Sequence, residues 1–85
     1  SYLVEHKIDL IAEFCDEILV MENGTIVYDG PTKEILAKRE LMDHNAAIPE
    51  VAKFGHAMSD AGKPLSRIPV TLSEALDLVK ERSAR

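Results

Sequence analysis

The chain has 85 residues, of which 46% are hydrophobic and 29% are charged, and its formal net charge is −5. This length predicts one small domain, and the hydrophobic content is too high for a disordered chain. The acidic balance excludes a generally basic surface for nucleic acid or for an anionic membrane, because both need an excess of Lys and Arg. We therefore expect a small folded protein with no nucleic-acid partner.

The charge is divided unevenly along the chain. Residues 1–50 contain eleven acidic and four basic side chains, a net charge of −7, whereas residues 51–85 contain four acidic and six basic ones, a net charge of +2. This division favours two different modules. The single cysteine, Cys15, lies in an apolar-periodic segment, which predicts a buried thiol in a reducing compartment.

The first predicted elements are a strand and a helix. Residues 2–4 have the pattern of the end of a buried strand, and the sequence starts there with neither an initiator Met nor a lead-in. Residues 8–15 carry apolar side chains at helical spacing, with acidic side chains opposite. A start inside a strand favours a cut through a larger sheet.

A β-hairpin is predicted over residues 18–22 and 25–28. Asn23 and Gly24 lie between two apolar runs, and both central positions of a type I′ turn require the positive φ that Asn and Gly tolerate best. The run at residues 18–21 is continuously apolar, which predicts a strand covered on both faces.

Three helices are predicted after the hairpin. The first covers residues 33–44, bends near Arg39, and begins with either Thr32 or Gly30 as its N-cap. The second runs from residue 48 to residue 61 and ends at Gly62. A loop over residues 63–70 precedes a capping box at residues 71–74 and a last helix ending near Arg82.

His6 is the first candidate functional residue, because it directly follows the predicted strand. Ligands of open α/β sheets bind at the carboxyl ends of the strands, where an imidazole can contact a phosphate or position a water. A solvated histidine at a strand end is the more common arrangement, so position alone does not establish a site.

Other candidate motifs favour structural roles. Gly62-Lys63 fails the P-loop pattern, because Ala57 stands in place of the first glycine and Pro64 in place of the hydroxyl residue. Glu22 follows an apolar strand, as a magnesium ligand would, but the turn after it makes it the end of a hairpin strand.

No metal site is predicted. Glu40 and His44 are four residues apart on one helix, but no second pair has zinc-like spacing. His56 lies on the polar face of the second helix, beside Glu50 and Asp60, and is expected to be solvated. The opposite arc, Val51, Phe54 and Met58, is expected to be apolar and without cover.

Four segments of the first part occur in a specific order: Leu3-Val4-Glu5-His6, a helix ending Phe14-Cys15-Asp16, the hairpin run 18–27, and Gly30-Pro31 followed by Glu34-Ile35-Leu36. Together they resemble the ATP-binding subunit of an ABC transporter, from its histidine switch loop onward. The later segments 48–51 and 72–76 are similar to the C-terminal extension in ATPases of energy-coupling-factor importers.

This resemblance implies a fold and a set of partners. The fold class would be α/β, with residues 1–38 the C-terminal end of a P-loop NTPase domain and residues 39–85 an all-helical extension. The intact protein would be an ATPase that uses ATP and Mg²⁺, with a transmembrane transporter subunit and a second ATPase subunit as partners. It would be cytoplasmic and peripheral on the inner face of the cell membrane.

The same resemblance gives His6 a role. The switch histidine of the family contacts the γ-phosphate of ATP and helps to orient the attacking water, although Lys7 departs from the more common aspartate after it. The P-loop, the signature motif and the aspartate–glutamate pair are absent from these 85 residues. We therefore expect the chain by itself neither to bind nor to hydrolyse ATP.

Two alternatives remain open at this point. Residues 39–85 could be a helical interaction or dimerisation module, because the apolar arc of the second helix lacks a cover in so short a chain. The chain could also be a small stand-alone α/β binding protein.

Overall fold

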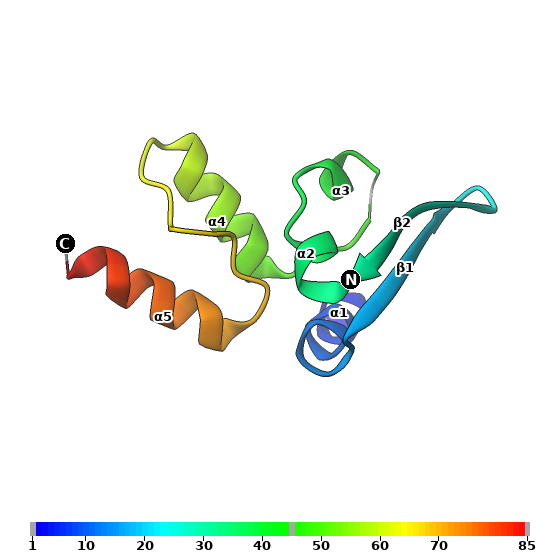
Figure 1. Ribbon diagram of the computed structural model, residues 1–85, viewed down its shortest axis with the longest axis horizontal. Helices are drawn as coiled ribbons and strands as arrows, with labels where there is room; N and C mark the ends of the chain where they lie inside the picture. Colours follow the sequence, from blue (N-terminus) through cyan, green and yellow to red (C-terminus); the bar gives the residue numbers. More distant parts are fainter. Residues whose placement is uncertain (1, 45, 85) are drawn as a thin grey trace.

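A computed structural model describes the backbone of residues 2–44 and 46–84 and the side chains of residues 7–44 and 46–84. The molecule is elongated, with principal extents of 45 × 25 × 24 Å. A two-stranded antiparallel hairpin extends from one end, two C-terminal helices lie at the other, and the N-terminal helix and two short helices lie between them (Figure 1). The elements are α1 (Tyr2–Phe14), β1 (Glu17–Glu22), β2 (Thr25–Pro31), α2 (Thr32–Leu36), α3 (Glu40–Asp43), α4 (Glu50–Asp60) and α5 (Leu72–Ser83).

The strand predicted at residues 2–4 is wrong, because these residues form the first turn of α1. A strand needs a neighbour to pair its backbone N–H and C=O groups, whereas a helix satisfies them within one segment. The described sheet is β1 and β2 alone, and both strands are already paired with each other. The helix predicted at residues 8–15 is confirmed, and it extends back to Tyr2.

The hairpin is confirmed, with Asn23 and Gly24 at φ values of 51° and 79°. Glu22 pairs with Thr25 and Met21 with Ile26, after which the register shifts by one residue. The coverage predicted on both faces of β1 is wrong, since exposed and half-buried residues alternate along the strand. One face packs toward the core and the other carries the exposed side chains Leu19 and Met21.

The predicted bend near Arg39 is a break between α2 and α3. The Lys38 amide donates to the Ile35 carbonyl at 3.1 Å, and the Leu41 amide donates to the Lys38 carbonyl at 3.2 Å, so tight turns replace the helical ladder. The N-cap of α2 is Pro31, which is neither of the two residues predicted.

Helix α4 ends at Asp60, and Gly62, whose φ is 77°, has the C′ position that was predicted for it. The Gly62 amide donates to the Ser59 carbonyl at 3.0 Å and the Lys63 amide to the Met58 carbonyl at 2.9 Å, which is the Schellman pattern. The predicted polar face of this helix is wrong at one position, because His56 is buried beside Ala52 and Gly55. An ideal Cβ on Gly55 would lie 2.8 Å from Pro69, so only glycine lets the 63–70 loop pack this closely.

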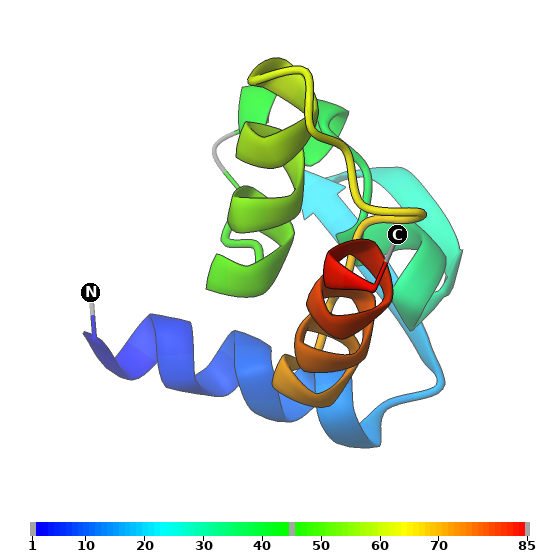
Figure 2. The same cartoon turned by 90° about the vertical axis from the view of Figure 1, so that its left-hand side faces the viewer.

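The core joins both parts of the chain. Its buried cluster includes Ala12 of α1, Leu36 of α2, Leu41 of α3, Ala52 of α4 and Val70 of the last loop. Figure 2 shows α4 and α5 in front, with α1 running beneath α4. Residues on both sides of the predicted boundary at positions 38 and 39 therefore share one core.

The prediction of a buried thiol is wrong, because Cys15 is free and exposed. Helix α1 ends at Phe14, so Cys15 leaves the apolar face that its helical spacing predicted. Among the described residues no helix has both the length and the apolar character that a membrane span requires.

Candidate functional site

His6 lies within α1, one helical turn before Asp9 and Leu10. Its side chain is outside the described part of the structure. The strand end on which its geometric interpretation depended is absent, because the backbone there is helical. The role of His6 in phosphate contact therefore remains a prediction that depends on the family resemblance.

A first hollow of the described structure is a groove of about 250 Å³ between α1 and the first turns of α4 and α5. Its apolar lining comes from Val51, Val70 and Leu72, and Thr71 also lines it. The carboxylate-bearing residues Asp9, Glu13 and Glu50 complete the lining. Both predicted modules contribute walls to this groove.

The second hollow, of about 320 Å³, lies between the end of α1 and the start of α2. Cys15, Thr32 and Lys33 line it together with the acidic residues Glu13 and Asp16. The Thr32 hydroxyl is fully buried and has no hydrogen-bond partner in the described structure. Because that oxygen is inaccessible, it offers no contact to a molecule in the hollow.

Neither hollow suits a nucleoside triphosphate. Phosphate sites in proteins present backbone N–H groups and cations, whereas the first hollow has three acidic residues and no basic one in its lining. The second hollow has one basic residue, Lys33, beside two acidic ones. The volume of the first hollow is below the range for small-molecule sites, and that of the second is at the lower end of this range. The described residues also lack any cluster of three or more His, Cys, Asp and Glu able to hold a metal ion.

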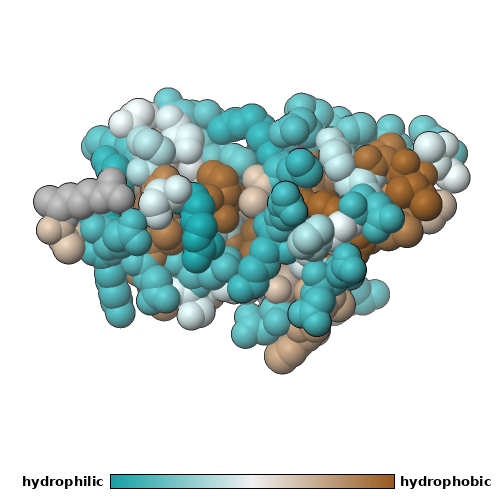
Figure 3. Space-filling model, viewed as in Figure 1, coloured by the Kyte–Doolittle hydropathy of each residue, from teal (hydrophilic) through white to brown (hydrophobic). Residues whose placement is uncertain are grey.

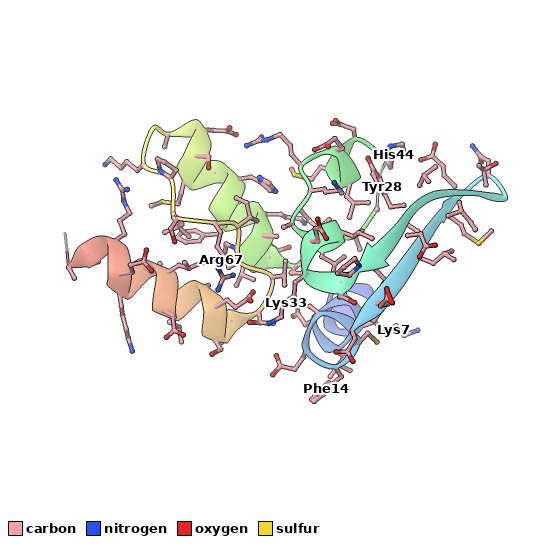
Figure 4. All side chains as sticks on the ribbon, in the orientation of Figure 1. Lys7, Phe14, Tyr28, Lys33, His44 and Arg67 are labelled. Carbon is pink, nitrogen blue, oxygen red and sulfur yellow. The ribbon has the colours of Figure 1, made fainter. Side chains whose placement is uncertain are left out.

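Glu74 is the most heavily partnered ionisable side chain of the described structure. Its Oε2 lies 3.2 Å from the Lys33 Nζ of α2 and 3.2 Å from an Arg67 guanidinium nitrogen. Figure 4 shows the Lys33 and Arg67 side chains reaching the same region, between α2 and the start of α5. Glu74 thus connects α5 to both the last loop and the first part of the chain.

The other carboxylate oxygen of Glu74 completes the predicted capping box. Its Oε1 accepts from the backbone amides of Val70 at 2.9 Å and Thr71 at 3.3 Å, and the Glu74 amide donates to the Thr71 hydroxyl at 3.2 Å. Burial alone would raise the pKa of Glu74, but the Val70 amide, the Lys33 hydrogen bond and the positive charges outweigh it and lower the pKa below 4.5.

The Glu74→Gln variant is expected to lose about 1–2 kcal/mol of unfolding free energy at pH 7. The folded pKa lies below the unfolded value, so the stabilisation is present above about pH 4.5 and disappears as the pH falls through the folded pKa. Urea titrations at several pH values should therefore show the difference from wild type shrinking in acid. Asp77→Asn, an exposed change on the same helix, should show a smaller difference, and equal losses in both variants would contradict this role.

A second cluster joins the hairpin to the residues after α3. The His44 ring contacts the Glu22 carboxylate, and its ring centroid lies 5.8 Å from that of Tyr28 in an edge-to-face arrangement. The Lys38 ammonium lies 5.7 Å from the centre of the Tyr28 ring. The four-residue spacing had placed Glu40 and His44 together on one helix as a possible metal-binding pair. In the structure, His44 contacts Glu22 of the hairpin instead.

Arg39 connects the break between α2 and α3 to the end of α4. Its guanidinium donates to the two Asp60 carboxylate oxygens at 2.8 and 3.2 Å and to the His56 carbonyl at 3.3 Å. The buried His56 Nε2 has no partner within the described residues. The Arg39–Asp60 ion pair is exposed to solvent, so it fixes the position of the two segments more than it adds to stability.

The comparisons with known proteins point to one kind of relative. The chain is 30% identical over 79 residues to the energy-coupling factor transporter ATP-binding protein EcfA2 of Streptococcus agalactiae (serotype Ia). It is 32% identical over 79 residues to the EcfA2 protein of Streptococcus pyogenes (serotype M5). Each alignment covers 92% of this chain and 28% of the relative. No protein-family profile matches the chain.

This similarity relates the chain to the ATP-binding subunits of ABC transporters, as the order of its segments predicted. More narrowly, its relatives are the ATP-binding proteins of energy-coupling factor transporters. The chain spans 28% of the length of these relatives, and it corresponds to a part of them.

The sequence predicted the capping role of Glu74 but missed its two ionic partners. Lys33 and Arg67 are 41 and 7 residues away along the chain, and neither belongs to a recognisable motif. The groove was also missed, because its walls come from three helices whose relative positions are set by the core. The helical spacing of Asp9 and Glu13, which lie four residues apart on one face, was the one available signal.

Proposed function

We propose that this chain forms the C-terminal part of the ATP-hydrolysing subunit of an energy-coupling-factor importer. Residues 1–38 would end the ATPase core, and residues 39–85 would form its helical extension. The observation that carries this proposal is the similarity over 79 residues to two streptococcal ATP-binding proteins, of which the chain covers 28%.

An exposed apolar surface on the hairpin and α1 supports this proposal. Phe14 is 77% exposed and points away from the molecule in Figure 4, and apolar colouring gathers over the hairpin end in Figure 3. Large exposed apolar patches mark interfaces in soluble proteins. In the proposed subunit, the remainder of the ATPase domain would cover it. The surface contains Leu10, Phe14, Leu19, Met21 and Ile26, which are 49–77% exposed.

In the intact subunit, ATP and Mg²⁺ would be held by elements outside this chain, because the described hollows carry carboxylates where phosphates would need cations. His6 is the residue of this chain that would contact the γ-phosphate and position the attacking water. The subunit would act at the inner face of the cell membrane, with a transmembrane subunit and a second ATPase subunit as partners.

Calorimetric titration of the 85-residue chain with ATP and Mg²⁺ tests the proposed division of roles. We expect no binding heat at micromolar ATP, since the chain lacks a P-loop. A full-length streptococcal EcfA2 protein, titrated alongside, should bind. Micromolar affinity of the isolated chain would contradict the proposal.

A second candidate function is an interaction module formed by residues 39–85. The specific observation is a row of exposed apolar side chains along α5, with Leu72, Leu76 and Val79 exposed by 66%, 53% and 38%. Phe54 of the predicted apolar arc is 44% exposed, whereas Val51 and Met58 are half-buried. Deleting residues 39–85 from the longer subunit should then reduce its association, which sedimentation measures directly.

A further inference from the structure

The groove between α1, α4 and α5 combines an apolar floor with an acidic rim. Val70, which is 1% exposed, forms part of the floor, and Leu72 continues it outward with 66% of its surface exposed. The carboxylate-bearing residues of the rim stand on two elements, Asp9 and Glu13 on α1 and Glu50 at the start of α4. An occupant therefore meets apolar surface below and negative charge at the edges.

The rim charges are mostly uncompensated. Among the described residues, the carboxylates of Asp9 and Glu13 take part in no hydrogen bond or ion pair. Glu50 has one partner, the Lys53 ammonium at 3.1 Å, and that pair is exposed. The first turns of α4 and α5 each add about half a positive charge, which is smaller than the sum of the rim carboxylates.

We propose that this groove is a docking site for a basic amphipathic segment of a protein partner. Such a segment carries Lys or Arg at the rim and a large apolar side chain toward Val51, Val70 and Leu72. Charge complementarity selects this occupant, because an acidic peptide or an anionic lipid surface would be repelled by the rim. A volume of about 250 Å³ is below the usual range for drug-sized ligands and suits one or two inserted side chains.

The surrounding contacts keep the groove open. Val70 and Thr71 belong to its wall, and the Glu74 carboxylate holds both of their amides. The Lys33–Glu74 ion pair fixes that wall to α2, so an occupant meets a preformed surface. Binding here would contact residues 1–38 and residues 39–85 together.

The test uses the 85-residue chain and a fluorescent helical peptide composed of leucine and lysine, with anisotropy as the measurement. The double variant Asp9→Asn/Glu13→Gln is expected to weaken binding about fivefold or more at low salt. The matched control Asp43→Asn/Asp77→Asn changes the net charge equally at exposed positions outside the groove, and it should weaken binding less than twofold. Equal weakening by both double variants would overturn the proposal, because it would reduce the effect to overall charge.

The apolar floor has its own matched pair. Leu72→Ser should weaken peptide binding several-fold, whereas Leu76→Ser, on the same helix and 53% exposed, should leave it unchanged. All of the substituted side chains are exposed, so circular dichroism should match wild type in every variant. Unchanged binding in Leu72→Ser, or equal binding of a leucine–glutamate peptide, would also overturn the docking site. Neither result would alter the ATPase proposal, which rests on the sequence similarity to the streptococcal proteins and not on what binds in this groove.

Discussion

Replacement of His6 by alanine in the longer subunit is expected to lower ATP turnover by about 100-fold or more, while ATP affinity changes by less than about threefold. A side chain that positions a reacting water acts in the transition state, so its loss reduces turnover more than ground-state binding. Phosphoryl transfer depends mostly on positioning and electrostatic stabilisation, which is why one lost contact has so large an effect. Steady-state hydrolysis and a nucleotide-binding titration measure the two quantities.

Two controls separate this role from general disturbance of α1 and from the loss of any histidine. Lys7→Ala alters the next residue, which is exposed, and His44→Ala removes a histidine that contacts Glu22. Both controls should retain turnover within about twofold. Wild-type turnover in the His6 variant would refute the assignment, and a parallel loss of ATP binding would assign His6 a structural role.

Features encoded within a few neighbouring residues were predictable from the sequence. The Asn23-Gly24 turn, the Gly62 helix end and the Thr71–Glu74 capping box each depend on backbone conformation and on hydrogen bonds between near neighbours. Their sequence patterns are specific, because few residues tolerate positive φ or cap a helix well. All three occur in the structure where they were expected.

Features that depend on distant partners were not predictable in the same way. The apolar run of β1 indicated cover on both faces, but the described residues cover one face, and Leu19 stays 49% exposed. Residues 2–4 indicated a strand, but they are helical, and the two strands in the described part of the chain pair with each other. His56 was assigned to a polar face, yet it is buried, and its backbone carbonyl accepts from the Arg39 guanidinium.

The candidate site shows the same limit. His6 is a prediction from its place in an ordered set of segments, whereas the Glu74 ion pairs and the acidic groove arise from how α1, α2, α4 and α5 pack. The shared core, with Ala12 and Val70 in one cluster, brings these elements together. Charge division along the chain pointed to two modules, and the acidic groove lies where residues from both meet.

The Leu41→Ala variant is expected to lose about 2–5 kcal/mol of unfolding free energy. Leu41 is fully buried, with 0% of its surface exposed, and it belongs to the central cluster although α3 has only four residues. Removing its side chain leaves a cavity between elements that the rest of the core holds in place, so relaxation recovers little of the lost packing.

Such a loss is large for a chain of this length, because typical stabilities of about 0.05–0.15 kcal/mol per residue amount to roughly 4–13 kcal/mol over 85 residues. Urea denaturation followed by circular dichroism measures it. Met42→Ala is the matched control, since Met42 is the next residue of the same short helix and is 42% exposed. Its expected loss is within about 1 kcal/mol. Equal urea midpoints for Leu41→Ala and wild type would contradict the shared core, in which Leu41 packs with residues from both 1–38 and 39–85.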